Sequence, residues 1–342
     1  MSGYVFPLRA STESDGEAMV RATCPVDEDN TTVFTFFSEF NTQWQGQAAV
    51  ESVILVGILL AAVTGNVTIL LAIFRNPQLR TNTNLVIASL AVSDLLLAAG
   101  IPFILVTRVT RHWVFGQVTC KGVVYVQFMC GMCSILNLAF ISVERYMHVK
   151  PSPSGLVSRR TVLVILALSW LLSVAFPVPV ALAQRERTIY CDGTKYVFCG
   201  VSWPGGFRTD VYLASIVVIF FMAPLIAMCV CYTKLFLLVR RSSLASGSGT
   251  SGRTSRIQLR LIKMSAAIVA AFLLMLLPFF VLSFLGVEGA SITSSEFTAT
   301  LILALANTAA NPLIYGYFNT GIRHEVKAMC TCSARDTHEG QV

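Results

Sequence analysis

Two oppositely charged residues, Glu144 and Arg145, stand at the end of a long apolar stretch of this 342-residue chain. Charged side chains at the end of a membrane span are costly unless they are paired, solvated or put to use. Neighbouring helical residues point about 100° apart, so this pair lacks the spacing of a helical surface ion pair. Either the pair stops the span as a charged cluster, or it is a functional group at the membrane boundary.

Polar residues also lie deep within other apolar stretches. An ionisable side chain at such a depth is costly and therefore suggests a function. Asp94 stands in the second stretch, Ser134 in the third, and Asn307 and Asn311 in the seventh. In each of the last three stretches, a proline removes a backbone donor and can kink the helix: Pro224, Pro278 and Pro312. A kinked bundle with a polar centre suits a conformational switch, and it also suits a transporter.

The elements that must position these residues are seven apolar stretches, each close to the ~20 residues that cross a bilayer. The composition is that of a membrane protein, with 55% hydrophobic and 13% charged residues. Backbone groups in lipid must be satisfied within the chain, which predicts helices at 52–74, 84–106, 117–149, 161–182, 211–239, 259–287 and 297–318. We predict an all-α membrane protein: an N-terminal tail (1–51), a seven-transmembrane helix bundle (52–318), and a short amphipathic helix with a tail (319–342).

The basic residues indicate the orientation of the bundle. The chain carries a net charge of +7, and its Lys and Arg residues gather in alternate short loops. Such loops lie on the cytoplasmic side, so the charge is a topology signal rather than a nucleic-acid-binding face. We expect a multi-pass plasma-membrane protein with an extracellular N-terminus and a cytoplasmic C-terminus.

Several residues are candidates for covalent modification in that orientation. Cys120 begins the third span at its outer end, and the oxidising exterior favours a disulfide to Cys191 or Cys199 in the second outer loop. Asn30 begins a glycosylation sequon in the outer tail. Two cysteines after the last span are either palmitoylated or reduced thiols, Cys330 and Cys332.

Enzyme and transporter functions find little support in the chain. All four histidines lie near span ends or in the tails, at His112, His148, His324 and His338. The sequence contains neither a phosphate-binding loop nor a zinc-type spacing of ligands. A secondary transporter would show an inverted repeat of hydropathy, and no such repeat is visible. We therefore predict that the protein is not an enzyme.

Markers in every span resemble, in order, those of the rhodopsin-like (class A) G-protein-coupled receptors. They are Gly65-Asn66, Ser89 to Asp94, Glu144-Arg145-Tyr146, Trp170, Pro224 with Tyr232, Pro278, and Asn311-Pro312-Leu313-Ile314-Tyr315. The resemblance extends from residue 50 to residue 332. It implies an extracellular ligand, a heterotrimeric G protein and arrestin as partners.

The resemblance also implies roles for single residues. Arg145, restrained by Glu144, would engage the G protein when the sixth helix swings out. Tyr146, Tyr232, Asn311, Pro312 and Tyr315 belong to the same activation machinery. Ile135, Pro224 and Phe272 would connect it to the ligand pocket. Asp94, Ser134, Asn307 and Asn311 match the family's site for an allosteric sodium ion, the only cofactor expected.

The ligand is less defined by the sequence. Gln127 stands where amine receptors carry an aspartate, so a cationic amine would lack its counter-ion. Apolar residues above it, among them Phe128, Phe279 and Phe280, favour a lipid or neutral ligand, although ordinary helix packing explains them equally well. Arg108 at the outer end of the second span either anchors a ligand carboxylate or is an interfacial arginine.

A closer but patchy resemblance is to long-chain free fatty acid receptors. It rests on Ala48 to Glu51, on Arg108 with Trp113, and on Cys199 followed by Trp203. It implies a carboxylate bound by Arg108, with Trp113 and Trp203 covering it, and it selects Cys199 as the partner of Cys120. Cys24 and Cys191 would then be left for a second bridge. The first inner loop is equally similar to that of melatonin receptors, and a peptide ligand is the main alternative.

Overall fold

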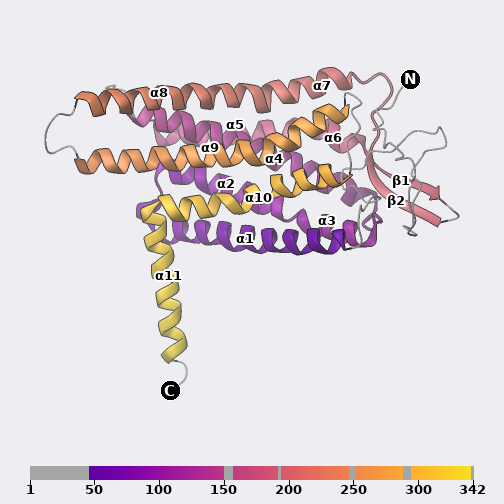
Figure 1. The fold of residues 1–342 in the computed structure, drawn as a ribbon, viewed down its shortest axis with the longest axis horizontal. Helices are drawn as coiled ribbons and strands as arrows, with labels where there is room; N and C mark the ends of the chain where they lie inside the picture. The colour runs from indigo at the N-terminus through magenta and orange to yellow at the C-terminus, as the bar shows by residue number, and fades with distance from the viewer. Residues whose placement is uncertain (1–45, 150–156, 192–193, 246–251, 288–293, 340–342) are drawn as a thin grey trace, which may run out of the picture.

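The computed structural model describes residues 46–149, 157–191, 194–245, 252–287 and 294–339 (Figure 1). The elements are α1 (Gln47–Arg75), η1 (Pro77–Leu79), α2 (Asn82–Ala98), α3 (Ile101–Thr110), α4 (Gly116–Val149), α5 (Arg159–Ala175), α6 (Val178–Ala183), β1 (Gln184–Cys191), β2 (Thr194–Val201), α7 (Thr209–Ile216), η2 (Val217–Met222), α8 (Ala223–Ala245), α9 (Gly252–Val287), α10 (Ser294–Phe318) and α11 (Thr320–Glu339).

These elements form a bundle of seven spans, as predicted. Within the described ranges, six helical segments are long and apolar enough to cross a membrane, and α9 adds a shorter apolar stretch, Ala266–Leu282. The spans run side by side along the long axis of the molecule, and α11 turns sharply away from them at one end (Figure 1). The first span begins at Gln47, so residues that we assigned to the N-terminal tail, Glu51 among them, are helical.

Glycine and proline divide three of the predicted spans into shorter elements. The second span breaks at Gly100, and a Cβ atom there would lie 2.9 Å from the Gln127 side-chain nitrogen, so glycine permits α4 to approach. The fourth span breaks before Pro177, which opens α6. The fifth contains a π-helical turn, η2, just before Pro224, whose missing amide hydrogen disturbs the regular hydrogen-bond ladder.

The structure adds a two-stranded hairpin to the predicted helical bundle. Strands β1 and β2 pair antiparallel, from Gln184 opposite Val201 to Cys191 opposite Thr194. The sequence between the strands is Asp192-Gly193, a pair that strongly favours hairpin turns, so a signal for this element was present. The hairpin projects from the end of the bundle opposite α11 (Figure 1). We call this the hairpin end and the opposite one, where Arg145 lies, the arginine end.

Close packing between the first and last spans fixes the middle of the bundle. A Cβ atom on Gly65 would lie 2.7 Å from Pro312 Cβ, so the two backbones meet only because residue 65 is glycine. Next to it, Asn66 donates its side-chain amide to the carbonyl oxygens of Ala62 and Thr308. These contacts hold α10, and with it the polar residues of its centre, against α1.

Candidate functional site

The hairpin end is held to α4 by covalent and backbone bonds. A disulfide joins Cys120 to Cys199, which confirms Cys199 as the partner. Buried Trp113 donates its backbone amide to Val197 at 2.8 Å. Gln117 bonds both to the Gln184 carbonyl and to the Glu186 amide. The proposed second bridge stays a prediction, because Cys24 and the side chain of Cys191 lie outside the described residues.

Arg108 does not present an open guanidinium at the rim of the bundle. It is 2% exposed, and its Nε and Nη2 both bond to Glu51 Oε2. Gln47 donates to the other carboxylate oxygen at 2.8 Å and also contacts Ser295 at 2.9 Å. Glu51, near the start of α1, thus supplies the carboxylate that we expected from a ligand. The ion pair joins α1 to α3 and, through Gln47, to α10.

Gln127 lies below the hairpin with its side chain unpaired. It is 7% exposed, and neither its Nε2 nor its Oε1 bonds to any described residue. The predicted pocket residues Trp113, Phe128, Trp203 and Phe279 belong to or pack against one apolar cluster at the hairpin end. Phe280 packs on the cluster nearer the arginine end. An amide with both donor and acceptor unsatisfied in an apolar setting is costly, which makes it a candidate ligand contact.

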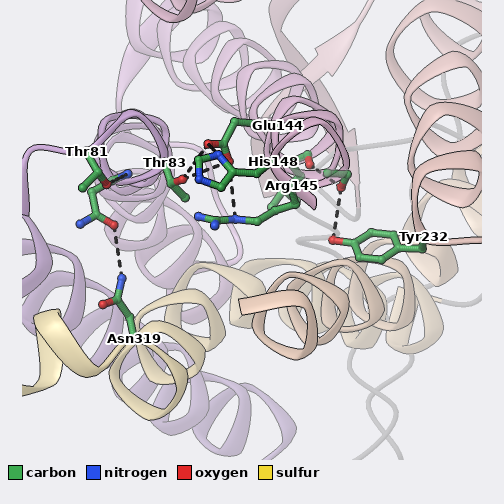
Figure 2. A network of polar contacts seen from close by, with 10 residues as sticks. Thr81, Thr83, Glu144, Arg145, His148, Tyr232 and Asn319 are labelled. Atoms are coloured by element: carbon green, nitrogen blue, oxygen red, sulfur yellow. Dashed lines mark hydrogen bonds and ion pairs between the residues drawn. The ribbon is translucent and has the colours of Figure 1, made fainter. Parts of the chain in front are cut away.

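Glu144 occupies the centre of the polar cluster at the arginine end (Figure 2) and is 3% exposed. Thr83 of α2 donates its hydroxyl to the carboxylate, 3.0 Å from both oxygens. Arg145 Nε lies 3.5 Å from Oε2, and His148 Nδ1 lies 3.9 Å from Oε1. Arg145 Nε makes no hydrogen bond within the described part of the chain. The carboxylate therefore holds Arg145 by charge attraction rather than by a well-formed hydrogen bond.

Two tyrosines lie close to this cluster. The Tyr232 hydroxyl, reaching in from α8, is 3.4 Å from the Ser142 hydroxyl (Figure 2). Tyr315 of α10 is 1% exposed, and its hydroxyl is unpaired within the described residues. Tyr146 faces α8 instead, with Lys234 Nζ 5.5 Å from its ring centre. Tyr232 is thus near Arg145 but is not bonded to it by any contact in Figure 2.

Asp94 and Asn311 form the polar centre between the two ends. The Asn311 amide donates to Asp94 Oδ2 at 2.9 Å, while Ser134 is bonded to Ser93 on α2. The Oδ1 atoms of Asp94, Asn307 and Asn311 have no hydrogen-bond partner among the described residues. One carboxylate and several neutral oxygens form the donor set that a hard cation prefers. The residues present therefore fit a sodium ion.

The predicted connector lies between these regions. Ile135 and Phe272 are buried in one apolar cluster with Met228 and Ile268, which joins α4, α8 and α9. Pro224 is buried on α8, beside the π-helical turn. The structure therefore brings α9, the helix that is expected to move, into apolar contact with α4.

The structure adds functional neighbours that the sequence interpretation missed. Thr83 and Glu51 lie 61 and 57 residues from their partners, and nothing in the local pattern connects them. His148 follows Glu144 by four residues, a helical spacing that could have identified it. Asn30 and the side chains of Cys330 and Cys332 lie outside the described residues, so glycosylation and palmitoylation stay predictions.

A family model for the 7 transmembrane receptor (rhodopsin family) matches residues 65–315. This chain belongs to that family. The rhodopsin-like G-protein-coupled receptor that the motifs indicated is thereby confirmed, and members of this family are receptors rather than enzymes. A crystal structure of squid rhodopsin superposes with a TM-score of 0.74 at 20% identity, over 88% of this chain and 90% of that one, and it supports the fold.

Receptors named for peptides are similar over most of this rhodopsin-family chain. Somatostatin receptor type 4 of Rattus norvegicus is 29% identical over 287 residues, which is 83% of this chain and 73% of the relative. A QRFP-like peptide receptor of Branchiostoma floridae is 28% identical over 310 residues, 87% and 81% of the two chains. These similarities are broader than the patchy resemblance to fatty acid receptors, which therefore does not identify the subfamily.

Proposed function

We propose that this rhodopsin-family receptor binds a peptide at its hairpin end and activates a heterotrimeric G protein at its arginine end. The unpaired amide of Gln127 carries the ligand part of the proposal. A peptide bond offers one donor and one acceptor, which matches what Gln127 lacks, whereas a cationic amine would need a carboxylate there. The names of the somatostatin and QRFP-like relatives support the same ligand class.

A long-chain fatty acid is the weaker candidate because its anchor is occupied. Glu51 already binds Arg108, and a ligand carboxylate would have to displace it from a nearly closed site. The side chains of the apolar cluster around Phe128 and Phe279 would contact apolar peptide side chains as favourably as an acyl chain. The lining therefore favours neither ligand, and the polar groups favour the peptide.

The orientation follows from charge and from cysteine chemistry. The hairpin end, which holds the Cys120–Cys199 disulfide, faces the oxidising exterior. The arginine end, with the basic loops, faces the cytoplasm. Asn30 would then be glycosylated outside, and Cys330 and Cys332 palmitoylated inside. A protease-protection assay of epitope tags at the two termini tests this topology, and a protected N-terminus would contradict it.

Signal transmission in this proposal uses the restrained Arg145. Ligand binding moves α9 outward through its apolar contact with α4 at Ile135 and Phe272. Arg145 then leaves Glu144, is supported by Tyr232 and Tyr315, and contacts the G protein or, later, arrestin. We expect Arg145→Ala to lose nucleotide exchange at normal surface expression, and full exchange by this variant would refute the role.

A sodium ion at Asp94 would stabilise the resting arrangement. Asp94, Ser134, Asn307 and Asn311 would hold it. The ion would supply the positive charge that balances the buried Asp94 carboxylate. We expect agonist affinity to fall when sodium replaces a bulky organic cation, and Asp94→Asn to abolish this dependence. Identical wild-type affinities in the two salts would remove the ion from the proposal.

The ligand class is tested with cells that express the receptor and report G-protein dissociation. Synthetic peptides and long-chain acids with their methyl esters are applied to the wild type, Gln127→Leu and Arg108→Gln. We expect a peptide response that Gln127→Leu weakens about tenfold, the value of roughly one polar contact. A response to acids but not to esters would instead support the fatty-acid alternative.

A further inference from the structure

His148 shares the Glu144 carboxylate with Arg145. The two residues approach different oxygens, His148 Nδ1 at 3.9 Å from Oε1 and Arg145 Nε at 3.5 Å from Oε2. The His148 side chain is 49% exposed, whereas that of Glu144 is 4% exposed. Protons from the solution therefore reach the imidazole directly, on the same helix face as the buried carboxylate (Figure 2).

We propose that His148 is a proton-dependent competitor of Arg145 for Glu144, so that acidification at the arginine end loosens Arg145 and raises G-protein activation. The inference rests on the proposed function, which gives Arg145 its role in coupling. Imidazole is the side chain that ordinarily changes charge between about pH 5 and pH 8. A charged His148 attracts the carboxylate toward Oε1, away from the oxygen that Arg145 faces.

The geometry of Thr83 makes this exchange feasible. Its hydroxyl lies 3.0 Å from both carboxylate oxygens, so the carboxylate can turn between its two neighbours without losing this bond. Arg145 Nε has no hydrogen bond to a described residue, so it loses only charge attraction when Glu144 turns. The competition is thus between two attractions of similar distance.

The other described side chains on the helices near the cluster, α2, α4, α8 and α10, carry no imidazole. Thr83, from α2, is neutral at every pH. From α8 come Tyr232 and Lys234, and from α10 comes buried Tyr315. Phenol and ammonium groups ordinarily titrate at about pH 10, well above the imidazole range. Among the described side chains named here, His148 is the one that carries an imidazole, and it lies 3.9 Å from the carboxylate.

The test measures ligand-independent nucleotide exchange by the purified receptor in lipid nanodiscs, using the heterotrimer from a G-protein panel that the wild type activates most. Exchange is compared between about pH 6 and pH 8, after subtraction of the receptor-free rate. The variants are His148→Gln and His148→Lys. The matched control is His324→Gln, an exposed histidine of α11 at the same end of the bundle.

We expect the wild type and His324→Gln to be about two- to fivefold more active at the lower pH, the range for a partly exposed ion pair. His148→Gln should stay at the low rate and His148→Lys at the high rate, both without pH dependence. The same pH profile for the wild type and His148→Gln, or a low rate for His148→Lys, would overturn the inference. Arg145→Ala distinguishes a failure of this inference from a failure of the proposed function. Full exchange by Arg145→Ala would refute the proposed function, in which Arg145 couples the receptor to the G protein.

Discussion

The two ends of the bundle are held by contacts of different strength. At the hairpin end, a disulfide joins α4 to β2, and the buried Arg108–Glu51 pair makes two hydrogen bonds with one carboxylate oxygen. At the arginine end, the Arg145–Glu144 contact is 3.5 Å long and the Tyr232–Ser142 contact is 3.4 Å long. Hydrogen bonds weaken as the distance between donor and acceptor grows, so the contacts at the arginine end are weaker than the hydrogen bonds of the Arg108–Glu51 pair.

This difference corresponds to two tasks. A surface that selects a ligand gains affinity when it is rigid before binding, because less conformational freedom is lost. An end that switches must have two arrangements separated by only a few kcal/mol. The close ion pair of Arg108 therefore lies where recognition is proposed, and the longer contact of Arg145 lies where movement is proposed. Substitutions at the two ends should separate these properties.

The largest effect is expected from Glu51→Gln at the hairpin end. The amide leaves the Arg108 charge buried and without its counter-ion, which costs about 3–5 kcal/mol of folding free energy. Thermal unfolding of the purified receptor measures the loss. The matched control is Asp210→Asn, the same chemical change in the exposed Arg208–Asp210 pair, which should leave unfolding unaltered. Equal effects of the two substitutions would show that the buried Arg108–Glu51 pair holds the hairpin end no more firmly than the exposed pair does.

A smaller effect is expected from Thr83→Val at the arginine end. It removes the hydrogen bond that Glu144 receives from α2, and a bond to a charged group contributes about 1.5–3 kcal/mol. Because Glu144 then restrains Arg145 less firmly, basal nucleotide exchange should rise as stability falls.

Thr68→Val is the control for that variant, since within the described residues the Thr68 hydroxyl bonds only to a carbonyl of its own helix. The two measurements are thermal unfolding and ligand-independent exchange. A Thr83→Val receptor that unfolds earlier yet keeps its basal exchange would show that Thr83 stabilises the fold without restraining Arg145.

The sequence predicted the seven spans because membrane burial requires long apolar helices. For the same reason, charged residues indicated approximately where each span ends. It did not predict the breaks at Gly100 and at the π-helical turn before Pro224, since these depend on which helix approaches. The hairpin was missed although Asp192-Gly193 favours such a turn. The strands are short and lie outside the apolar spans, so the hydropathy pattern that predicts the spans does not indicate them.

The site was predictable where residues act singly and unpredictable where they act in pairs. Glu144, Arg145 and Asp94 are unusual because of where they stand along the chain, so the sequence singled them out. The partners of Arg108 and Glu144 come from other helices, and neither Glu51 nor Thr83 is unusual locally. As a result, the sequence predicted that Arg108 binds a ligand carboxylate, whereas in the structure it binds the carboxylate of Glu51.

The smallest effect is expected from Ser142→Ala, which tests how weak the arginine end is. Its hydroxyl also donates to the Leu138 carbonyl of its own helix at 2.9 Å, so the 3.4 Å contact with Tyr232 adds little. We expect a change of about 0.5 kcal/mol or less in unfolding free energy and less than a threefold change in exchange. A loss as large as that of Glu51→Gln would mean that the Tyr232 contact fixes α8 to α4. The arginine end would then be as rigidly held as the hairpin end, and its movement would have to begin by breaking that contact.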